Sequence, residues 1–202
     1  LEQVLRDATL DPAFRALMLA LPTQAELAQM LHARGVTPDP DAIYAATETL
    51  RDAMATRWSA LLPELMAEAR VDAPYAPDAE QSGKRALGNA VLSLQTRLDG
   101  GKAAQAQYDD ADNMTMQLSA LSCLITAGAE DAALAAFEAQ WKDDRLVMDK
   151  WFALQVAATA PEKAVARAAA LTERADFDWK NPNRFRAVMG SLAMNHAGFH
   201  AK

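Results

Sequence analysis

Apolar residues recur along most of the chain at the three- and four-residue spacing that places side chains on one face of a helix. Between residues 39 and 65 this spacing predicts one long helix, with a kink near Pro63 because proline removes a helical hydrogen bond and its ring collides with the preceding turn. A further helix is expected over about 81–98, ending at Gly100-Gly101. The apolar residues that define the long helix are Ile43, Ala46, Leu50, Met54, Trp58, Leu61 and Leu65.

Local start and stop signals support the helical interpretation. Asp11-Pro12 supplies a helix-capping side chain followed by proline at the first helical position. Thr23 and Glu26 have the spacing of a capping box, in which each side chain satisfies a backbone amide of the other, and Gly35 marks the end of that helix. The Thr23 signal is the clearest helix start in the N-terminal part of the chain.

The C-terminal half is more regular. Helices are expected at about 114–127, 130–142, 147–159, 161–174 and 183–194, joined by short connectors such as Ala-Gly-Ala and Ala-Pro. Short connectors make neighbouring helices antiparallel, and related positions recur about every 34 residues, as in helix-pair repeats. The predicted fold is therefore all-α, a superhelix of antiparallel helix pairs like an armadillo or HEAT solenoid. An irregular helical bundle is the alternative.

The whole chain, residues 1–202, is expected to form a single helical-repeat domain. Its one obvious linker lies near residues 71–80, where Pro74 and Pro77 interrupt the helical pattern. The sequence starts at Leu1, without an initiator Met and inside a helical pattern, so we expect an excised piece of a longer protein.

Charge and composition exclude several classes of partner. The formal net charge of −7 disfavours binding to nucleic acid, which requires a clustered basic surface. No apolar run approaches the roughly 20 residues of a membrane helix. The lone cysteine, Cys123, is expected to be a buried apolar residue, and the absence of a disulfide partner fits a reducing, cytoplasmic location.

Metal chemistry is limited by the presence of only three histidines, His32, His196 and His200. His196 and His200 have the spacing of a zinc peptidase helix, His-Glu-x-x-His, but Ala197 replaces the Glu that would activate the metal-bound water. We therefore expect no metal ligands and no cofactor in this chain.

No other catalytic arrangement is evident. Gly100-Gly101-Lys102 lacks the spacing and the Ser or Thr of a phosphate-binding loop. The acidic run 109–112 lacks the glycine turn and distal Glu of a calcium loop, and a solvated loop before the next helix is expected there. The chain alone is predicted to have no catalytic residues and no enzymatic activity.

Four stretches are more specific than composition. They are Gly83-Lys-Arg-Ala-Leu-Gly-Asn-Ala-Val-Leu92, Asp112-Asn-Met-Thr115, Arg145-Leu-Val-Met-Asp-Lys-Trp-Phe152 and Asn181-Pro-Asn-Arg-Phe-Arg186. In this order they resemble the C-terminal region of bacterial aminopeptidase N enzymes, a family of zinc metallopeptidases, and the resemblance spans essentially the whole chain.

The resemblance implies a four-domain cytoplasmic peptidase in which zinc is bound by another, thermolysin-like domain. This chain would be a non-catalytic helical domain that packs on the other domains, closes the active-site chamber and helps to select short peptide substrates. The alternative is a stand-alone helical-repeat scaffold that binds peptides or proteins.

The resemblance also implies two candidate substrate-binding residues, Arg186 and Arg184. Arg186 occupies the second arginine position of the motif, which in the family faces the chamber near the C-terminal side of the substrate. A guanidinium suits a peptide carboxylate or carbonyl. A structural alternative is that both arginines cap helix ends or pair with Asp176 or Asp178. Met148, Trp151 and Phe152 are expected in the core.

Overall fold

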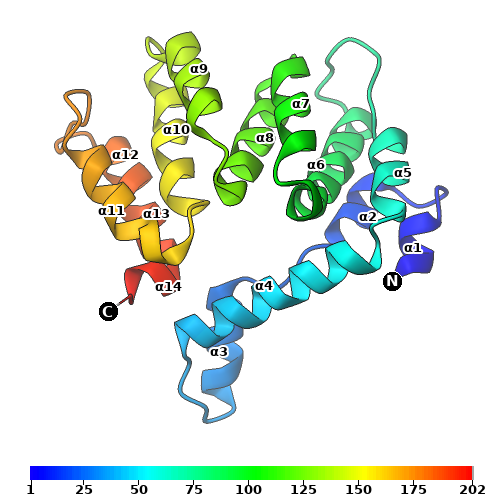
Figure 1. Ribbon diagram of the computed structural model, residues 1–202, viewed down its shortest axis with the longest axis horizontal. Helices are drawn as coiled ribbons and strands as arrows, with labels where there is room; N and C mark the ends of the chain where they lie inside the picture. Colours follow the sequence, from blue (N-terminus) through cyan, green and yellow to red (C-terminus); the bar gives the residue numbers. More distant parts are fainter. Residues whose placement is uncertain (202) are drawn as a thin grey trace. The chain divides into compact units, whose positions relative to one another are not determined.

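The structure is a computed structural model that describes residues 1–201. Over those residues the only regular elements are helices, with no β-strand, which confirms the predicted all-α class. The chain packs as two compact units (Figure 1). Unit 1 contains residues 1–22 and 47–127, and unit 2 contains residues 23–46 and those from Gly128 onward.

Unit 1 is organised around its longest helix, α6. Helix α6 packs against α2, α5, α7 and α8, and α7 packs against α8. Its helices are α1 (Glu2–Arg6), α2 (Pro12–Leu17), the second part of α4 (Pro40–Arg57), α5 (Leu61–Glu68), α6 (Ala79–Asp99), α7 (Lys102–Asp110) and α8 (Met114–Ala127).

The contact between α2 and α6 is close at a glycine. A Cβ atom added at Gly83 of α6 would lie 3.3 Å from the backbone nitrogen of Ala13, tighter than ordinary van der Waals contact. The helices therefore approach backbone to backbone at this point. Around it lies the core of the unit, which includes Leu5, Ala55, Leu62, Leu65, Leu87 and Val91.

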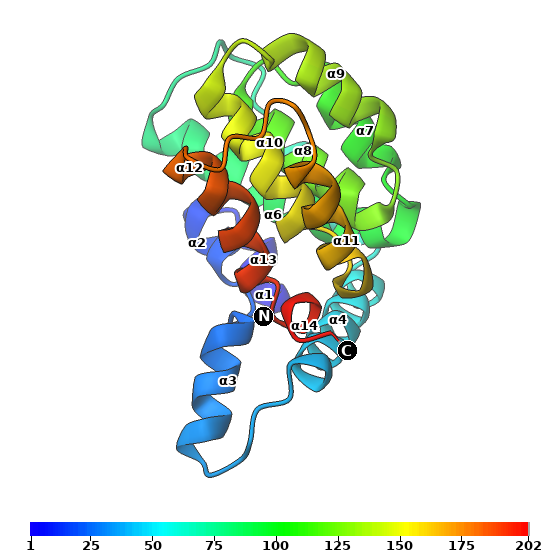
Figure 2. The ribbon, with the colours of Figure 1, turned by 90° about the vertical axis from the view of Figure 1, so that its left-hand side faces the viewer.

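Unit 2 is organised around α10, which packs against α9, α11, α12, η1 and α13. Helices α12 and α13 are joined end to end through η1, and α13 leads into α14 (Figure 2). The elements are α3 (Gln24–Ala33), the first part of α4, α9 (Asp131–Trp141), α10 (Arg145–Ala157), α11 (Pro161–Thr172), α12 (Pro182–Phe185), the π-helix η1 (Arg186–Gly190), α13 (Ser191–Met194) and α14 (His196–Phe199).

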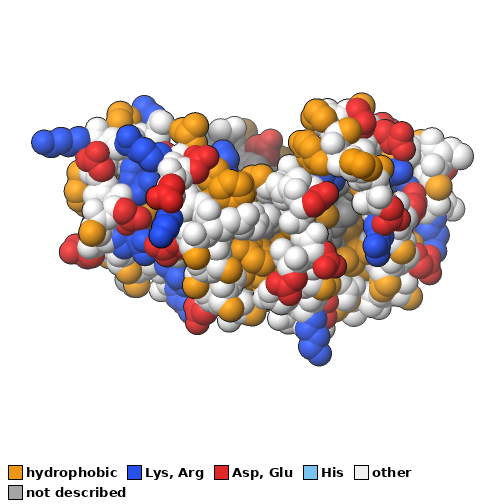
Figure 3. All heavy atoms as spheres, turned by 90° about the horizontal axis from the view of Figure 1, so that it is seen from above, with side chains coloured by type: hydrophobic (Ala, Val, Ile, Leu, Met, Phe, Trp, Pro, Cys, Tyr) orange, Lys and Arg blue, Asp and Glu red, His pale blue; other side chains and the backbone are white. Residues whose placement is uncertain are grey.

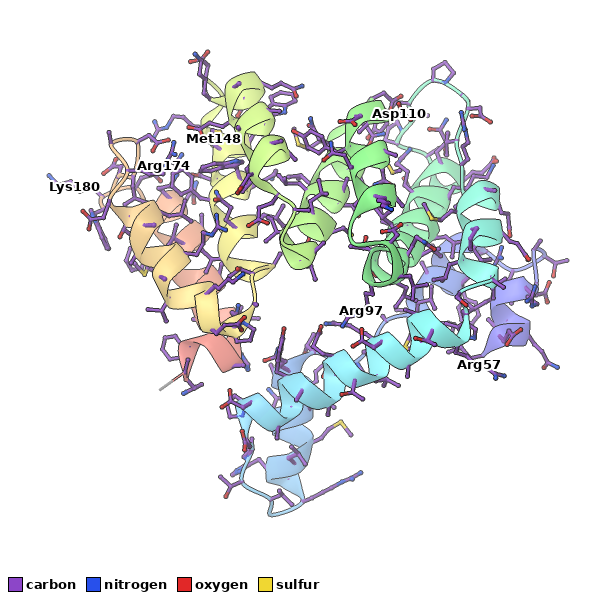
Figure 4. The ribbon with its side chains drawn as sticks, viewed as in Figure 1. Arg57, Arg97, Asp110, Met148, Arg174 and Lys180 are labelled. Atoms are coloured by element: carbon purple, nitrogen blue, oxygen red, sulfur yellow. The ribbon has the colours of Figure 1, made fainter. Side chains whose placement is uncertain are left out.

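The predicted core residues of unit 2 are confirmed. Met148, Trp151 and Phe152 are all buried, and the indole nitrogen of Trp151 donates a hydrogen bond to the carbonyl oxygen of Leu134 at 3.1 Å. This bond ties α10 to α9. In Figure 4, Met148 is labelled on α10.

The helix-start predictions are also confirmed. The Asp11 carboxylate accepts hydrogen bonds from the amides of Ala13 and Phe14 at the start of α2. Both halves of the capping box are formed, with Glu26 N donating to Thr23 Oγ1 at 3.2 Å and Thr23 N donating to Glu26 Oε2 at 2.7 Å. Local side-chain chemistry therefore sets these boundaries.

The single long helix expected between residues 39 and 65 is wrong. The chain breaks in a turn at residues 58–60, and Pro63 lies in the first turn of the separate helix α5. In one uninterrupted helix Pro63 would clash with the carbonyl group of Ser59 and leave it without a donor. Breaking the helix before that point moves proline to a position whose amide needs no helical partner.

Three further expectations are corrected. Helix α7 was not predicted, and Asp109 and Asp110 form its last two residues instead of a solvated loop. Gly101, expected only as part of a helix stop, is also the N-cap of α7, with φ of 93°. In addition, the helix expected at 183–194 is interrupted by the π-helical turns of η1.

Candidate functional site

The segment Asn181–Arg186 follows a short loop and contains the N-cap of α12, α12 itself and the first residue of η1. The Asn181 side chain accepts hydrogen bonds from the backbone amides of Asn183 and Arg184, and Pro182 occupies the first helical position. An asparagine cap followed by proline starts a helix at a defined residue. The positions of Arg184 and Arg186 are therefore fixed by local sequence.

Arg184 is buried, with 5% of its surface exposed. Its Nε donates to Asp149 Oδ1 at 2.6 Å, and its Nη1 donates to the carbonyl oxygen of Asp176 at 2.7 Å. The guanidinium also lies 4.0 Å from the centroid of the Phe152 ring. These contacts join α10, the loop before α12 and α12 itself, which is a structural role.

Arg186 has a different environment, although it is only two residues further along. It is exposed and begins η1. Its Nη1 donates to Asn183 Oδ1 at 3.2 Å, which is a neutral contact within the same segment. No carboxylate among residues 1–201 forms an ion pair with Arg186, so its charge is available to a ligand.

Aromatic rings extend from the core to the surface beside this segment. The ring centroids of Phe152 and Phe177 lie 6.1 Å apart, those of Phe177 and Trp179 4.9 Å apart, and those of Trp179 and Phe185 6.2 Å apart. Trp179 and Phe185 are 57% and 43% exposed. The surface next to Arg186 therefore combines a free cation with exposed aromatic area.

Arg174 supports the loop that leads to this segment. It pairs with Glu138 and Asp176, and its guanidinium lies 4.9 Å from the centre of the Trp151 ring. Arg174 is labelled in Figure 4. Partial burial raises the pKa of Asp176, but the hydrogen bond and charge of Arg174 and the charge of Arg184 outweigh it, so the pKa lies below its ordinary value. Asp176 is thus held as a carboxylate.

A shallow depression lies beside the start of this segment. It is lined by Arg145, Leu146, Asp149, Asp178, Lys180 and Asn181–Asn183. Seen from above in Figure 3, basic and acidic side chains are interspersed over the part of the surface that contains α11 and α12. Both signs of charge line this depression, so a ligand there would be recognised by individual side chains.

The histidines and the cysteine do not form a second site. His32 and His200 are exposed and His196 is half-buried. Within residues 1–201, no group of three or more His, Cys, Asp or Glu side chains is placed to hold a metal ion. Cys123 is buried as predicted, and burial raises the pKa of its thiol, which disfavours the reactive thiolate.

In the part of the chain that the structure describes, no helix is both long enough and apolar enough to span a bilayer.

Successive packed helix pairs without a metal centre in the described residues define an all-α helical-repeat module. The chain belongs to the family described as "Domain of unknown function (DUF3458_C) ARM repeats", whose model matches residues 1–202.

Curated relatives place this module within aminopeptidases. The chain is 36% identical over 206 residues to aminopeptidase N of Caulobacter vibrioides, covering 99% of the chain and 23% of the relative. It is also 36% identical over 209 residues to aminopeptidase N of Escherichia coli K12, covering 98% of the chain and 23% of the relative. The chain thus spans about a quarter of the length of these relatives, and the resemblance to their C-terminal end is confirmed.

A solved structure agrees with this assignment. The crystal structure of Legionella pneumophila aminopeptidase A in complex with aspartic acid superimposes with a TM-score of 0.85 and 27% sequence identity. The match covers 99% of the chain and 24% of that protein. The fold and the sequence therefore both relate the chain to part of an aminopeptidase.

Proposed function

We propose that this chain is the non-catalytic C-terminal helical domain of a cytoplasmic zinc aminopeptidase, where it closes the active-site chamber and helps to select short peptides. On the resemblance to the family, we assign zinc to the rest of the polypeptide. The partners are the other domains of the same polypeptide and short peptide substrates.

The observation that carries the proposal is the free charge of Arg186. Its guanidinium is exposed and bonded only to the neutral side chain of Asn183. Guanidinium groups bind carboxylates through two parallel hydrogen bonds. We assign Arg186 to the free carboxylate at the C-terminal end of a short peptide, a group that longer chains and folded proteins do not present at the same distance from the scissile bond.

Arg184 supports this site indirectly in our proposal. Its charge is compensated by Asp149, and its hydrogen bonds hold the loop and α12 together. We therefore treat Arg184 as a positioning residue that orients the segment carrying Arg186, while Trp179 and Phe185 supply adjacent apolar surface. The aspartic acid bound by the Legionella pneumophila relative is consistent with recognition of carboxylate-bearing ligands in such enzymes.

The test uses Arg186→Ala in the intact polypeptide. Losing a charge-assisted hydrogen bond costs about 1.5–3 kcal/mol, so kcat/KM for dipeptides and tripeptides with a free C-terminus should fall by about 10- to 150-fold. The same peptides with a C-terminal amide should lose much less, because they lack the charge that Arg186 recognises. Steady-state kinetics on both series measure the difference.

Lys180→Ala provides the matched control, because it removes one exposed positive charge from the same end of unit 2 (Figure 4). It should affect both series equally and slightly. Arg186→Lys should retain part of the preference for the free acid, since it keeps the charge but loses the planar fork. If Arg186→Ala impaired acids and amides to the same extent, the carboxylate role would be withdrawn.

A further inference from the structure

Unit 1 contains a pocket that the family assignment does not explain. It has a volume of about 460 Å³ and lies between the linker after α5 and helices α6, α7 and α8. Much of its lining is apolar, including Met66, Ala69, Val71, Ala103, Ala106 and Met116. Pockets of this size that combine apolar walls with a few polar groups are typical of small-molecule sites.

The linker wall of the pocket is fixed by side chains of α6. Gln81 accepts a hydrogen bond from the amide of Ala76 and donates one to the carbonyl oxygen of Pro74, both at 2.9 Å. Arg85 donates to the carbonyl oxygen of Ala76 at 3.0 Å, and its guanidinium lies 4.8 Å from the centre of the Tyr75 ring. The pocket is therefore built before any ligand arrives.

Arg85 has an unusual charge balance. It is 93% buried, since 7% of its surface is exposed, and it lines the pocket. Its guanidinium donates hydrogen bonds to the neutral oxygens of Gln81, Ala76 and Ser82. No carboxylate among residues 1–201 forms an ion pair with it. A buried cation without a counter-ion is costly, and an anionic group in the pocket would offset that cost.

The side of the pocket formed by the end of α7 and the following turn has the opposite charge. Asp110 and Asp112 line it, and Figure 4 shows Asp110 at the end of α7. The Asp112 carboxylate accepts a hydrogen bond from Asn113, while the Asp110 carboxylate forms no ion pair with another residue in the range 1–201. Of the other charged residues in the lining, Arg70 forms an ion pair with Asp72 and also interacts electrostatically with Asp110.

We propose that this pocket binds a free α-amino acid with an apolar side chain. The carboxylate lies toward Arg85, the ammonium group lies toward Asp110 and Asp112, and the side chain occupies the apolar wall. A simple anion would meet the carboxylates of Asp110 and Asp112, and a simple cation would meet Arg85. A zwitterion satisfies both sides of the pocket.

This site would couple the enzyme to its own product class, because an aminopeptidase releases free amino acids. The binding proposal itself does not rest on the function proposed for Arg186, which lies in the other unit. A failure of one proposal therefore leaves the other intact.

Isothermal titration calorimetry of the 202-residue chain with L-leucine tests the proposal. Saturable binding of L-leucine is expected, with both N-acetyl-L-leucine and L-leucinamide at least about fivefold weaker, because each lacks one of the two charges. Circular dichroism of the same sample establishes that it is helical. The absence of L-leucine binding to the helical chain overturns the proposal, and so does equal binding of the three compounds.

Two neighbouring aspartates locate the site. Asp110→Asn should weaken L-leucine by about fivefold, the effect of losing one partly exposed charge contact. Asp109→Asn is the matched control, since Asp109 is exposed on the same helix, does not line the pocket and accepts a hydrogen bond from Gln105. It should leave the affinity unchanged. Equal effects of the two substitutions would place L-leucine elsewhere and overturn the assignment.

Discussion

Each unit contains a buried arginine stacked on an aromatic ring, but the two differ in how their charge is compensated. In unit 2, Arg184 lies over Phe152 and pairs with the carboxylate of Asp149. In unit 1, Arg85 lies over Tyr75 and bonds only to neutral oxygens. Burial and ring stacking are similar, so the difference between the two sites is the presence of a counter-ion.

This comparison separates a structural arginine from one that is prepared for a ligand. An arginine and a carboxylate that neutralise each other need no ligand charge, and their ion pair holds together the helices that carry them. A buried charge without a partner is tolerated where the surrounding fold holds it in place and where a ligand supplies the missing charge. Arg184 belongs to the first kind and Arg85 to the second.

The largest expected effect is the loss of stability in Arg184→Met. The substitution leaves the Asp149 carboxylate, whose side chain is 15% exposed, without its partner. Breaking a buried pair from one side costs about 3–5 kcal/mol. Urea denaturation should show this decrease, and adding Asp149→Leu to the same chain should recover part of it. Additive losses in the double variant would contradict the pairing.

Arg85→Met should cost less, about 1–2 kcal/mol, because the loss of its hydrogen bonds is partly offset by the removal of a buried charge that has no counter-ion. The linker before α6 should also become less ordered, since Arg85 holds the carbonyl of Ala76. Hydrogen exchange of residues 70–78 measures that change alongside the denaturation curve. A stability loss as large as that of Arg184→Met would mean that Arg85 has a counter-ion.

The smallest expected effect is a loss of stability in acid. The hydrogen bond from Arg15 lowers the pKa of Glu68 below 4.5 despite partial burial. Burial raises the pKa of Asp176, but Arg174 and Arg184 outweigh it and bring the value below 3.8. Both carboxyls therefore stabilise the fold at any pH above these ordinary pKa values. Their contribution is lost as the pH falls through the lower pKa values of the folded state.

The unfolding free energy, measured from pH 7 to pH 3, should stay level at first and decrease below about pH 5. Glu68→Gln and Asp176→Asn should each make the acid limb shallower, with a modest change because both side chains are more than a third exposed. An acid limb that both substitutions leave unchanged would show that other groups control it.

Sequence predicted the helices whose ends carry a local signal. The helix over 114–127 was predicted with the bounds that α8 has, and the capping box at Thr23 marks the start of α3. Helix α7 was missed because Gly100-Gly101 indicates a stop, whereas Gly101 also starts the next helix. Pro63 predicts a disruption of the long helix near that residue. The position of the break, at residues 58–60, depends on the turn that precedes α5.

The candidate site shows a sharper limit of sequence information. Arg184 and Arg186 are two residues apart, and the motif gives no indication that only one of them is buried. That outcome depends on Asp149, which is 35 residues away in sequence, and on the ring of Phe152. The pocket around Arg85 was not predicted either, because its charged groups come from α6, α7 and the linker, and only the fold brings them together.

The central functional claim is that Arg186 recognises the free carboxylate of a short peptide. The most direct measurement is the ratio of kcat/KM for a dipeptide acid to that for its amide, with both substrates measured on the same preparation, for the intact polypeptide and for its Arg186→Ala variant. Differences in folding or zinc content cancel in this ratio. We predict that the ratio falls by about tenfold or more, the value of one charge-assisted contact. An unchanged ratio would contradict the account.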